Sequence, residues 1–293
     1  MQKEKKLIIV GIDGVRTDCF EKAKTPNIDY LIKNGVYSNC MHIVSSKEKM
    51  EGADTLSGPG WSHILTGVWP NKHKVKNNTF ENHDLNSYKD IFTRIKENNP
   101  KSYTASFVSW KPVYDNLVKN CDLKFLEDFT SYSDSVEDKD ELVDNKITKE
   151  AVKVIRENKD LTAAFIYLHQ VDAIGHLSGF SPQNHQYIKA IERCDHHTGQ
   201  LIEALESRKN NDKEDWLILV VTDHGGWEKD HAQGSEKEEI TNVFWVLNGH
   251  KFKGKEFKTK CYLTDIAPTA LSHFNYNISY KDFDGSVQLP EEK

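Results

Sequence analysis

The chain has 293 residues, of which 37% are hydrophobic and 10% aromatic, so it can bury a core as one α/β domain or two smaller ones. Its formal net charge of −6 argues against a protein that grips a nucleic-acid backbone, which needs clustered lysines and arginines. A run of about 18 apolar residues is absent from the sequence, so we expect no membrane-spanning helix.

The amino-terminal segment, MQKEKKLIIVGIDG, places basic residues before an apolar run that ends at Gly11. This run is too short for the apolar region of a secretory signal, and we interpret it as a first strand. The 5 cysteines are scattered and form no Cys-x-x-Cys pair, which is typical of free thiols in a reducing compartment. We therefore expect a cytoplasmic protein, and the sequence does not indicate its oligomeric state.

Apolar runs alternate with stretches of helical periodicity along the chain. The expected order is strand 6–13, helices 27–33 and 87–97, strand 103–110, helix 146–157, strand 161–172, helix 186–206 and strands 215–225 and 240–249. This alternation predicts an α/β fold in one domain over residues 1–293, with a mostly parallel central sheet and helices on both faces. The loop-rich residues 79–102 and 111–145 are candidates for small cap insertions over the site.

Residues 55–67, TLSGPGWSHILTG, lie between the first two expected strands. Pro59 suits the first turn of a helix, because its missing N–H would have no partner there. Ser57 would then lie at a helix N-terminus, where a hydroxyl can cap the helix and where anions bind. The segment by itself leaves open whether Ser57 is a cap or a nucleophile.

Three of the expected strands end in an aspartate, and three histidines follow these aspartates closely in the sequence. The residues are Asp13, Asp172, His176, Asp223, His224 and His231. The carboxyl ends of parallel strands meet at one edge of a sheet, where three carboxylates would repel unless a cation compensates them. Mixed Asp and His ligands suit zinc or a similar divalent metal, and the set is large enough for two metal ions.

These segments together resemble the alkaline phosphatase superfamily, and within it the nucleotide pyrophosphatase/phosphodiesterase branch. The resemblance extends over nearly the whole chain, from GIDGVR through TPNIDYLIKNGV to TDIAPTALSHF. In that branch the nucleophile is followed by Pro at +2, Thr-Gly at +9 and +10, Pro at +13, His at +16 and an oxyanion-binding Asn at +21. Counted from Ser57, those positions hold Pro59, Thr66, Gly67, Pro70, His73 and Asn78.

The resemblance implies that Ser57 is the nucleophile, that Asn78 binds a phosphoryl oxygen, and that the fold is alkaline-phosphatase-like with its metal site at the carboxyl ends of the strands. It also implies two metal sites. One consists of Asp13, Ser57, Asp223 and His224, and the other of Asp172, His176 and His231. One metal would activate the Ser57 hydroxyl and the other would stabilise charge on the leaving oxygen, with zinc expected and manganese as the alternative. Ser57 would form a covalent phosphoseryl intermediate.

The chain departs from the branch at two positions. Phosphodiesterase members mostly carry Thr where this chain has Ser57, as alkaline phosphatases do. His231 follows His224 by seven residues, whereas family members often place the last histidine much further on. His231 is still the expected ligand, because the later metal histidine of the superfamily precedes a strand like the one expected at 240–249. Thr55 breaks the register and is not expected to be the nucleophile.

Some residues are candidates for substrate binding. Lys111 follows an expected strand and could reach the site, although an exposed loop lysine explains it equally well, and Val113 stands where some phosphomonoesterases of the superfamily have an Arg. Trp61, together with Trp110, Tyr114 and Trp227, could form an aromatic floor for a nucleobase or an apolar leaving group, or pack in the core. We interpret four further histidines as surface or packing residues: His63, His169, His196 and His197.

The expected function is a two-metal phosphoester hydrolase that cleaves a phosphodiester or a pyrophosphate in a small phosphorylated substrate, with nucleotides among the candidates. The alternative is a phosphomonoesterase that uses the same site, but a monoester dianion needs extra cations and Lys111 is the clear one. A sulfatase is less favoured, because SGPGW lacks the Arg of the C/S-x-P-x-R motif, and a phosphomutase usually carries an extra domain. A non-catalytic metal-binding relative would usually have lost at least one of these site residues, and all are present.

Overall fold

The computed structural model describes residues 3–133, 138–257, 260–289 and 291–292. Its central sheet has 8 strands in the order β4-β3-β5-β1-β6-β7-β2-β9. The strands are β1 (Glu4–Ile12), β2 (Gly35–His42), β3 (Tyr103–Val108), β4 (Leu123–Leu126), β5 (Leu161–Leu168), β6 (Glu214–Val221), β7 (Asn242–Asn248) and β9 (Cys261–Tyr262). β7 runs antiparallel to both of its neighbours, and the other pairs in the sheet are parallel. The prediction of a mostly parallel sheet is therefore confirmed.

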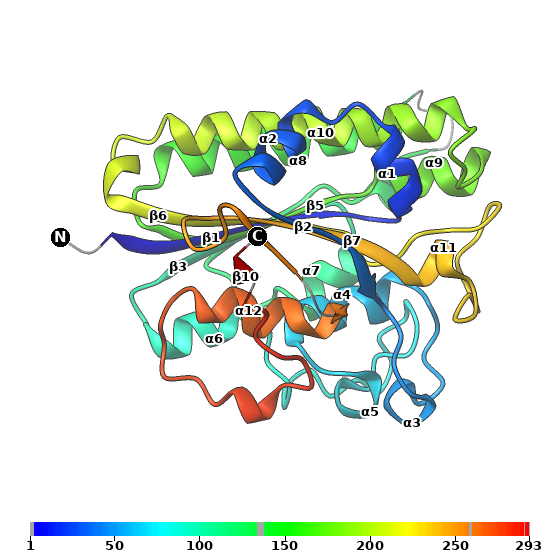
Figure 1. Ribbon diagram of the computed structural model, residues 1–293, viewed down its shortest axis with the longest axis horizontal. Coiled ribbons are helices and arrows are strands. Elements are labelled where there is room, and N and C mark those ends of the chain that lie inside the picture. The colour runs from blue at the N-terminus through cyan, green and yellow to red at the C-terminus, as the bar shows by residue number, and fades with distance from the viewer. Residues whose placement is uncertain (1–2, 134–137, 258–259, 290, 293) are drawn as a thin grey trace.

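Helices cover both faces of the sheet (Figure 1). The upper layer in this view contains α1 (Thr17–Lys22), α2 (Pro26–Lys33), α8 (Lys139–Glu157), α9 (Gln170–Ser178) and α10 (His185–Glu206). The lower layer contains α3 (Lys47–Met50), α4 (Ser57–Thr66), α5 (Pro70–His73), α6 (Ile91–Asn98), α7 (Lys111–Asn116) and α12 (Ile266–Ser272). The short α11 (Glu238–Thr241) precedes β7, and β8 (Lys255–Glu256) pairs with β10 (Glu291–Glu292) outside the main sheet.

The apolar run of β1 is continuous because both faces of this strand are covered. Successive side chains of a strand point to opposite faces. Leu7 and Ile9 accordingly belong to the core under the lower helices, whereas Ile8 and Val10 belong to the core under the upper helices. The described residues thus form one main sheet with a core on each face, and a single domain over residues 1–293 stays a prediction.

The boundaries of several predicted elements differ from the structure, and the strand expected over 215–225, for example, ends at Val221. The strand expected over 161–172 ends at Leu168, and α9 begins two residues later, so Asp172 lies in the first turn of a helix and not at a strand end. The helix expected over 87–97 begins at Ile91, because the Asp90 carboxylate caps it by accepting from the N–H groups of Phe92 and Thr93. The helix expected over 146–157 begins earlier, at Lys139.

The two stretches predicted as cap insertions contribute in part to the main fold. Residues 79–102 contain α6, whose apolar side packs on the lower core. Residues 111–145 contain β4, an edge strand of the central sheet, and the short 3-10 helix Phe129–Ser131, while 134–137 lie outside the described residues. Whether any part of them closes over the site stays a prediction.

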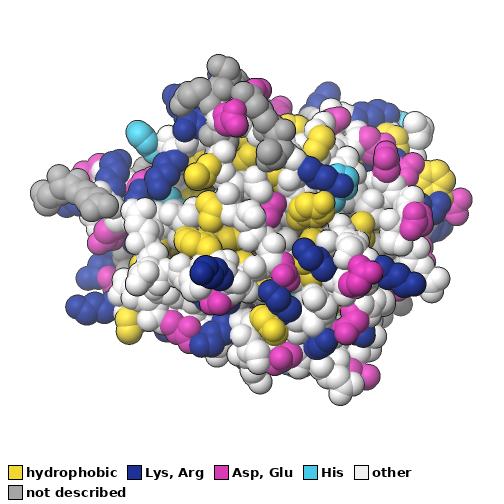
Figure 2. Space-filling model, turned by 60° about the horizontal axis from the view of Figure 1, so that its bottom comes forward, with side chains coloured by type: hydrophobic (Ala, Val, Ile, Leu, Met, Phe, Trp, Pro, Cys, Tyr) yellow, Lys and Arg dark blue, Asp and Glu magenta, His cyan; other side chains and the backbone are white. Residues whose placement is uncertain are grey.

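Charge on the lower face is mixed. Figure 2 shows Lys and Arg side chains interspersed with Asp and Glu side chains, without a continuous basic surface on the face that is visible. This distribution agrees with the negative net charge of the chain. In the described part of the chain, the structure has no helix whose length and apolar character would allow it to span a membrane.

Helix α4 contains a buried imidazole that has no hydrogen-bond partner. His63 is 1% exposed, and both of its ring nitrogens are without a partner among the described residues. Its ring packs on Trp69 with centroids 4.9 Å apart. Burial lowers the pKa of His63 to about 3, so the imidazole stays neutral in the folded protein at neutral pH.

This pKa shift predicts that the stability of the protein depends on pH, and that His63→Phe makes this dependence weaker. The unfolded chain takes up a proton at His63 below about pH 6.5, whereas the folded chain does so only near pH 3, so stability is lost as the pH falls through this window. Between pH 7 and pH 5 we expect the unfolding free energy of the wild type to fall by about 2 kcal/mol more than that of the variant, measured by urea denaturation. His196→Phe, at an exposed position, is the matched control and should behave as the wild type; equal slopes for all three proteins would contradict the prediction.

Candidate metal centre

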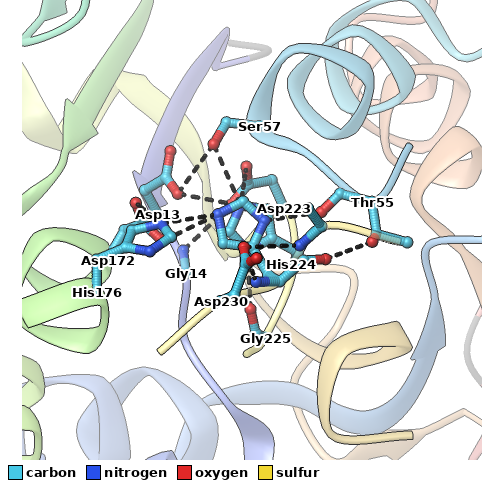
Figure 3. Close-up of polar contacts among 12 residues, drawn as sticks. Asp13, Gly14, Thr55, Ser57, Asp172, His176, Asp223, His224, Gly225 and Asp230 are labelled. Atoms are coloured by element: carbon cyan, nitrogen blue, oxygen red, sulfur yellow. Dashed lines mark hydrogen bonds and ion pairs between the residues drawn. The ribbon is translucent and has the colours of Figure 1, made fainter. Parts of the chain in front are cut away.

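The three central strands of the sheet, β5, β1 and β6, are direct neighbours, and their carboxyl ends form the floor of the site. Asp13 directly follows β1, and its N–H donates to the carbonyl of Leu168 at the end of β5 at 2.9 Å. Asp223 follows β6, and its Oδ1 accepts from the N–H of Gly14 at 3.2 Å. Asp172 comes from α9, which starts just after β5. The predicted meeting of three carboxylates at one edge of the sheet is therefore observed (Figure 3).

Helix α4 brings Ser57 to this floor from the lower layer. Ser57 is the first residue of the helix, and its Oγ lies 3.4 Å from Asp13 Oδ1 and 3.2 Å from His224 Nε2. The glycines on either side of Pro59 make this approach possible. A Cβ on Gly58 would lie 2.5 Å from the carbonyl oxygen of Asn77, and a Cβ on Gly60 would lie 2.9 Å from Cβ of Asp223. The Gly-Pro-Gly sequence thus starts the helix and lets its first turn touch the carboxylates.

The three histidines of the site are all oriented in the same way by backbone carbonyl groups. Nδ1 of each ring lies 2.8 Å from a carbonyl oxygen, which belongs to Lys229 for His176, to Gly225 for His224 and to Thr55 for His231. A carbonyl oxygen only accepts, so Nδ1 carries a proton in each ring and the lone pair of the neutral imidazole is on Nε2. This arrangement is typical of histidines that bind metals through Nε2.

The Nε2 atoms converge on the carboxylates. Nε2 of His231 lies 3.1 Å from Nε2 of His176 and 3.5 Å from Asp172 Oδ1, and the rings of His231 and His224 stack with centroids 3.7 Å apart. Two neutral rings whose lone pairs face each other at this distance repel, unless a proton or a cation lies between them.

The buried carboxylates have unused oxygens. Asp172 Oδ1 and Asp223 Oδ2 are fully buried and have no hydrogen-bond partner among the described residues. Their ligand atoms fall into two groups in which all atoms lie within 4.8 Å of one another. These groups are Asp13, Asp223 and His224, and Asp172, His224 and His231. Oxygen and imidazole donors in compact groups with unpaired buried oxygens fit divalent metal ions of the zinc type.

In the metal-free protein, protons compensate part of the negative charge. Burial and the nearby charge of Asp172 raise the pKa of Asp13 to about 6. Burial and the charges of Asp13 and Asp172 raise the pKa of Asp223 well above its usual value. The hydrogen bond to Asp172 raises the pKa of His176 to about 9, whereas burial lowers the pKa of His224 to about 3. Metal binding to this cluster must therefore release protons.

Asn78 lies beside the nucleophile candidate, as predicted. Its Oδ1 accepts from the N–H of Gly58 at 2.8 Å, which fixes the side-chain amide at the first turn of α4. The Nδ2 group is left to donate toward the cavity that Asn78 lines together with Ser57 and Asp13. An amide donor in this position can stabilise negative charge on a phosphoryl oxygen.

The prediction that Trp61 contacts the substrate is wrong. The Trp61 side chain is completely buried beneath the site, where its ring packs on Tyr167 and its Nε1 donates to Asp13 Oδ2 at 3.0 Å. The Tyr167 hydroxyl donates to the same oxygen. Both residues therefore orient the Asp13 carboxylate from below. Trp61 lies four residues after Ser57 on α4, so both side chains are on the same face of the helix and reach the Asp13 carboxylate, but Trp61 lies one turn further along the helix and its ring is therefore beneath the site.

The structure does not bring Lys111 into the site. Lys111 begins α7, its side chain is 57% exposed, and its Nζ lies 2.5 Å from Asp115 Oδ2. The cavity over the site has a volume of about 230 Å³, and Lys111 is absent from its described lining. The lining consists of Asp13, Leu56, Ser57, Asn78, Trp110, Phe129, Tyr167, His169, Asp172, His176, Asp230 and His231.

Several site residues were not identified from the sequence. His169, which we interpreted as a surface or packing residue, lines the cavity with its ring stacked on Phe129, at a centroid distance of 3.6 Å. Thr55 fixes the His231 loop, since its hydroxyl donates to the His231 carbonyl while its own carbonyl accepts from Nδ1 of that ring. The sequence offered two signals: His169 comes just after β5, and Thr55 comes just before Ser57. Neither position shows where the side chain points.

Comparisons with known proteins identify related sequences. The sequence profile of the type I phosphodiesterase / nucleotide pyrophosphatase family matches residues 7–233. The bis(5'-adenosyl)-triphosphatase ENPP4 of Bos taurus is 24% identical over 236 residues, which cover 75% of this chain and 47% of that protein. The human ectonucleotide pyrophosphatase/phosphodiesterase family member 5 is also 24% identical, over 76% of this chain and 45% of its own length. The chain thus spans about half the length of these relatives.

Solved structures share the fold. An inactive variant of murine ectonucleotide pyrophosphatase/phosphodiesterase 5 in complex with AMP superposes with a TM-score of 0.72 at 16% identity, and the match covers 98% of this chain and 100% of that one. A 2-O GAG sulfatase superposes with a TM-score of 0.75 at 15% identity, covering 100% of this chain and 75% of that one.

The crowded carboxylates predict that Asp223→Asn stabilises the metal-free protein while it weakens metal binding. An Asn at this position can still accept from the Gly14 N–H but carries no charge, so repulsion with Asp13 and Asp172 is removed. We expect the melting temperature in chelator to rise by about 2–4 °C per kcal/mol gained, and the further rise on adding zinc to be much smaller than in the wild type. Asp212→Asn, at an exposed position, should change neither value, and a wild-type response of Asp223→Asn to zinc would refute its role as a ligand.

Proposed function

The chain belongs to the type I phosphodiesterase / nucleotide pyrophosphatase family, a metal-dependent family, and we propose that it hydrolyses phosphodiester or pyrophosphate bonds through a covalent phospho-Ser57 intermediate. The observation that carries this proposal is the position of Ser57 Oγ. It lies at the N-terminus of α4, within 3.4 Å of Asp13 Oδ1 and His224 Nε2, and the amide of Asn78 lies beside it.

We propose that the ligand groups hold two divalent metal ions, with zinc as the first candidate and manganese as the second. The first would be held by Asp13, Ser57, Asp223 and His224. The second would be held by Asp172, His176 and His231, because the Nε2 atoms of the two histidines lie 3.1 Å apart and each lies within 3.5 Å of an oxygen of Asp172. His224 belongs to both compact groups and is assigned to the first ion. When bound, such ions lower the pKa of a hydroxyl and neutralise charge that develops on phosphoryl and leaving oxygens. The unpaired buried oxygens of Asp172 and Asp223 support this assignment.

The residues of the chain divide the reaction into two displacements. Ser57 Oγ attacks phosphorus, its bond to phosphorus forms, and the bond from phosphorus to the leaving oxygen breaks. The N-terminus of α4 favours the negative phosphoryl group, and Asn78 Nδ2 donates to one of its oxygens. The Ser57 hydroxyl proton released in this first displacement ends on the leaving oxygen or in solvent. In the second displacement the oxygen of water forms a bond to phosphorus, the bond between phosphorus and Oγ breaks, and a proton of that water restores the Ser57 hydroxyl.

A diester or pyrophosphate bond fits this site better than a monoester. Among the described residues that line the cavity there is no lysine or arginine, and the acidic residues Asp13, Asp172 and Asp230 are part of the wall. A phosphomonoester dianion places two charges on its terminal phosphoryl group and needs more cationic partners than a diester does. Nucleotides are the first substrates to test, since a relative with this fold binds AMP.

The test of this proposal compares a nucleoside p-nitrophenyl phosphodiester with p-nitrophenyl phosphate, each with zinc and with manganese. We expect a higher kcat/KM for the diester. An advantage for the monoester would assign the site to a phosphomonoesterase. Inactivity on both substrates in a protein that binds metal would instead indicate a non-catalytic relative.

Ser57→Ala should lower kcat by about three orders of magnitude or more, because it removes the nucleophile and leaves the carboxylate and imidazole ligands in place. Metal content, measured by elemental analysis, should remain near the wild-type value. Ser62→Ala is the matched control on the same helix, since the Ser62 hydroxyl donates to the Gly58 carbonyl and lies away from the cavity. Substantial residual turnover by Ser57→Ala would exclude it as the nucleophile.

Asn78→Asp should lower kcat by about 10²–10³-fold, because the carboxylate can still accept from the Gly58 N–H but cannot donate to a phosphoryl oxygen. Asn77→Asp adds the same charge at the next residue, whose side chain is exposed, and should have little effect. Equal losses in both variants, measured by steady-state kinetics, would show that charge alone matters and that Asn78 is not a donor.

A further inference from the structure

A second cavity, with a volume of about 660 Å³, adjoins the site between α8 and α9. Four residues line both cavities: Phe129, His169, Asp172 and His176. Its remaining lining residues come from the start of α8 and from the exposed side of α9. They are Asp138, Lys139, Asp140, Ala173, Ile174 and Leu177.

The second cavity lies on the leaving-group side of the reaction. In an in-line displacement, the leaving oxygen is opposite the attacking oxygen, which here is Ser57 Oγ. The second cavity includes Asp172 and His176, the residues assigned to the leaving oxygen, but it includes neither Ser57 nor Asn78. A group attached to the leaving oxygen would therefore extend into it.

The walls of this cavity are poorly suited to an anion. Phe129, Ile174 and Leu177 present apolar surface, and the Leu177 side chain is 69% exposed. The His169 ring is stacked on Phe129 with an interplanar angle of 7°, and its Nε2 lies 3.3 Å from Asp140 Oδ1. The His169 imidazole, which could carry a positive charge, is thus already paired with the Asp140 carboxylate.

The charged residues at the start of α8 do not make the cavity better suited to an anion. Lys139 is the one lysine or arginine in the described lining, and it stands between Asp138 and Asp140 in the sequence. An inorganic phosphate or pyrophosphate leaving group would have to enter a space bounded by acidic and apolar side chains. Such a group is normally bound by several lysines, arginines or helix N-termini.

We propose that the cavity between α8 and α9 receives the leaving group and selects an uncharged alcohol with an apolar body over an inorganic phosphate or pyrophosphate. This inference rests on the proposed phosphodiesterase function and narrows it to organic diesters. The Phe129–His169 pair, held by Asp140, forms the part of the wall nearest to the phosphoryl site. The apolar side of α9, at Ile174 and Leu177, contacts the body of the alcohol.

The test uses two substrates that share the thymidine 5'-phosphoryl group and differ in the leaving group: thymidine 5'-(p-nitrophenyl phosphate) and thymidine 5'-triphosphate. Leu177→Lys places a cation in the cavity wall. We expect it to lower kcat/KM for the aryl diester and to raise kcat/KM for the triphosphate, so that their ratio changes by about fivefold or more relative to the wild type. Taking the ratio within each protein removes the intrinsic difference in reactivity between the two leaving groups.

Leu289→Lys is the matched control, since Leu289 is 75% exposed and absent from the described lining of both cavities. Its ratio should stay within about twofold of the wild type. Binding gives a second readout. Calorimetry measures the Kd of each substrate for Ser57→Ala with and without Leu177→Lys. We expect the diester to bind more weakly and the triphosphate more tightly when the lysine is present.

Equal turnover ratios for Leu177→Lys and Leu289→Lys, together with equal binding ratios for Ser57→Ala with and without Leu177→Lys, would overturn the inference. If the wild type hydrolyses neither substrate, the proposed function fails, and the binding ratio still decides whether the cavity selects against the triphosphate. Hydrolysis of both substrates with a ratio that does not respond to Leu177→Lys keeps the proposed function and excludes the cavity as the leaving-group site.

Discussion

The site depends on one electrostatic constraint: the carboxylates of Asp13, Asp172 and Asp223 are buried together beside the carboxyl ends of three neighbouring strands, with Asp172 contributed by the first turn of α9. Like charges in such a place destabilise the folded protein unless protons or cations compensate them. In the metal-free protein protons do this in part, as the raised pKa values of Asp13 and Asp223 show. Divalent cations can compensate the negative charge while the ligands stay deprotonated. The instability of the metal-free cluster therefore itself favours metal binding.

The rest of the local structure keeps these groups in place. Backbone carbonyls orient all three imidazoles through Nδ1, so that every Nε2 faces the carboxylates. Trp61 and Tyr167 hold the Asp13 carboxylate from below through hydrogen bonds to Oδ2. These supporting contacts are as much part of the site as the ligands, because they fix ligand direction before any metal or substrate arrives. They also explain why Trp61, one turn from the nucleophile, is buried and absent from the described lining of the cavity.

The two helical layers have different tasks in the proposed reaction. The lower layer contributes α4, which carries the nucleophile and positions Asn78 through Gly58. The upper layer contributes α9, which carries Asp172 and His176 on one side and the apolar wall of the second cavity on the other. The phosphoryl group would thus be held where the layers meet, at the edge of the sheet. Selection of the leaving group would depend on α8 and α9, away from the residues that perform the chemistry.

The sequence by itself determined the fold class, the order of the main elements and the identity of the ligand candidates, because continuous apolar runs and aspartates after them are local patterns. Ser57 and Asn78 were also identified from it, through the spacing that the chain shares with its family. Only the tertiary structure decided where side chains point. Asp172 lies on a helix because β5 ends at Leu168, Trp61 is buried because it lies one turn beyond Ser57 on α4, and Lys111 is turned to Asp115. His169 enters the site because Phe129 and Asp140, distant in sequence, pack against its ring. The burial of Trp61 against Tyr167 and the position of His169 depend on contacts between segments that are far apart in the chain, and periodicity along the sequence carries no information about them.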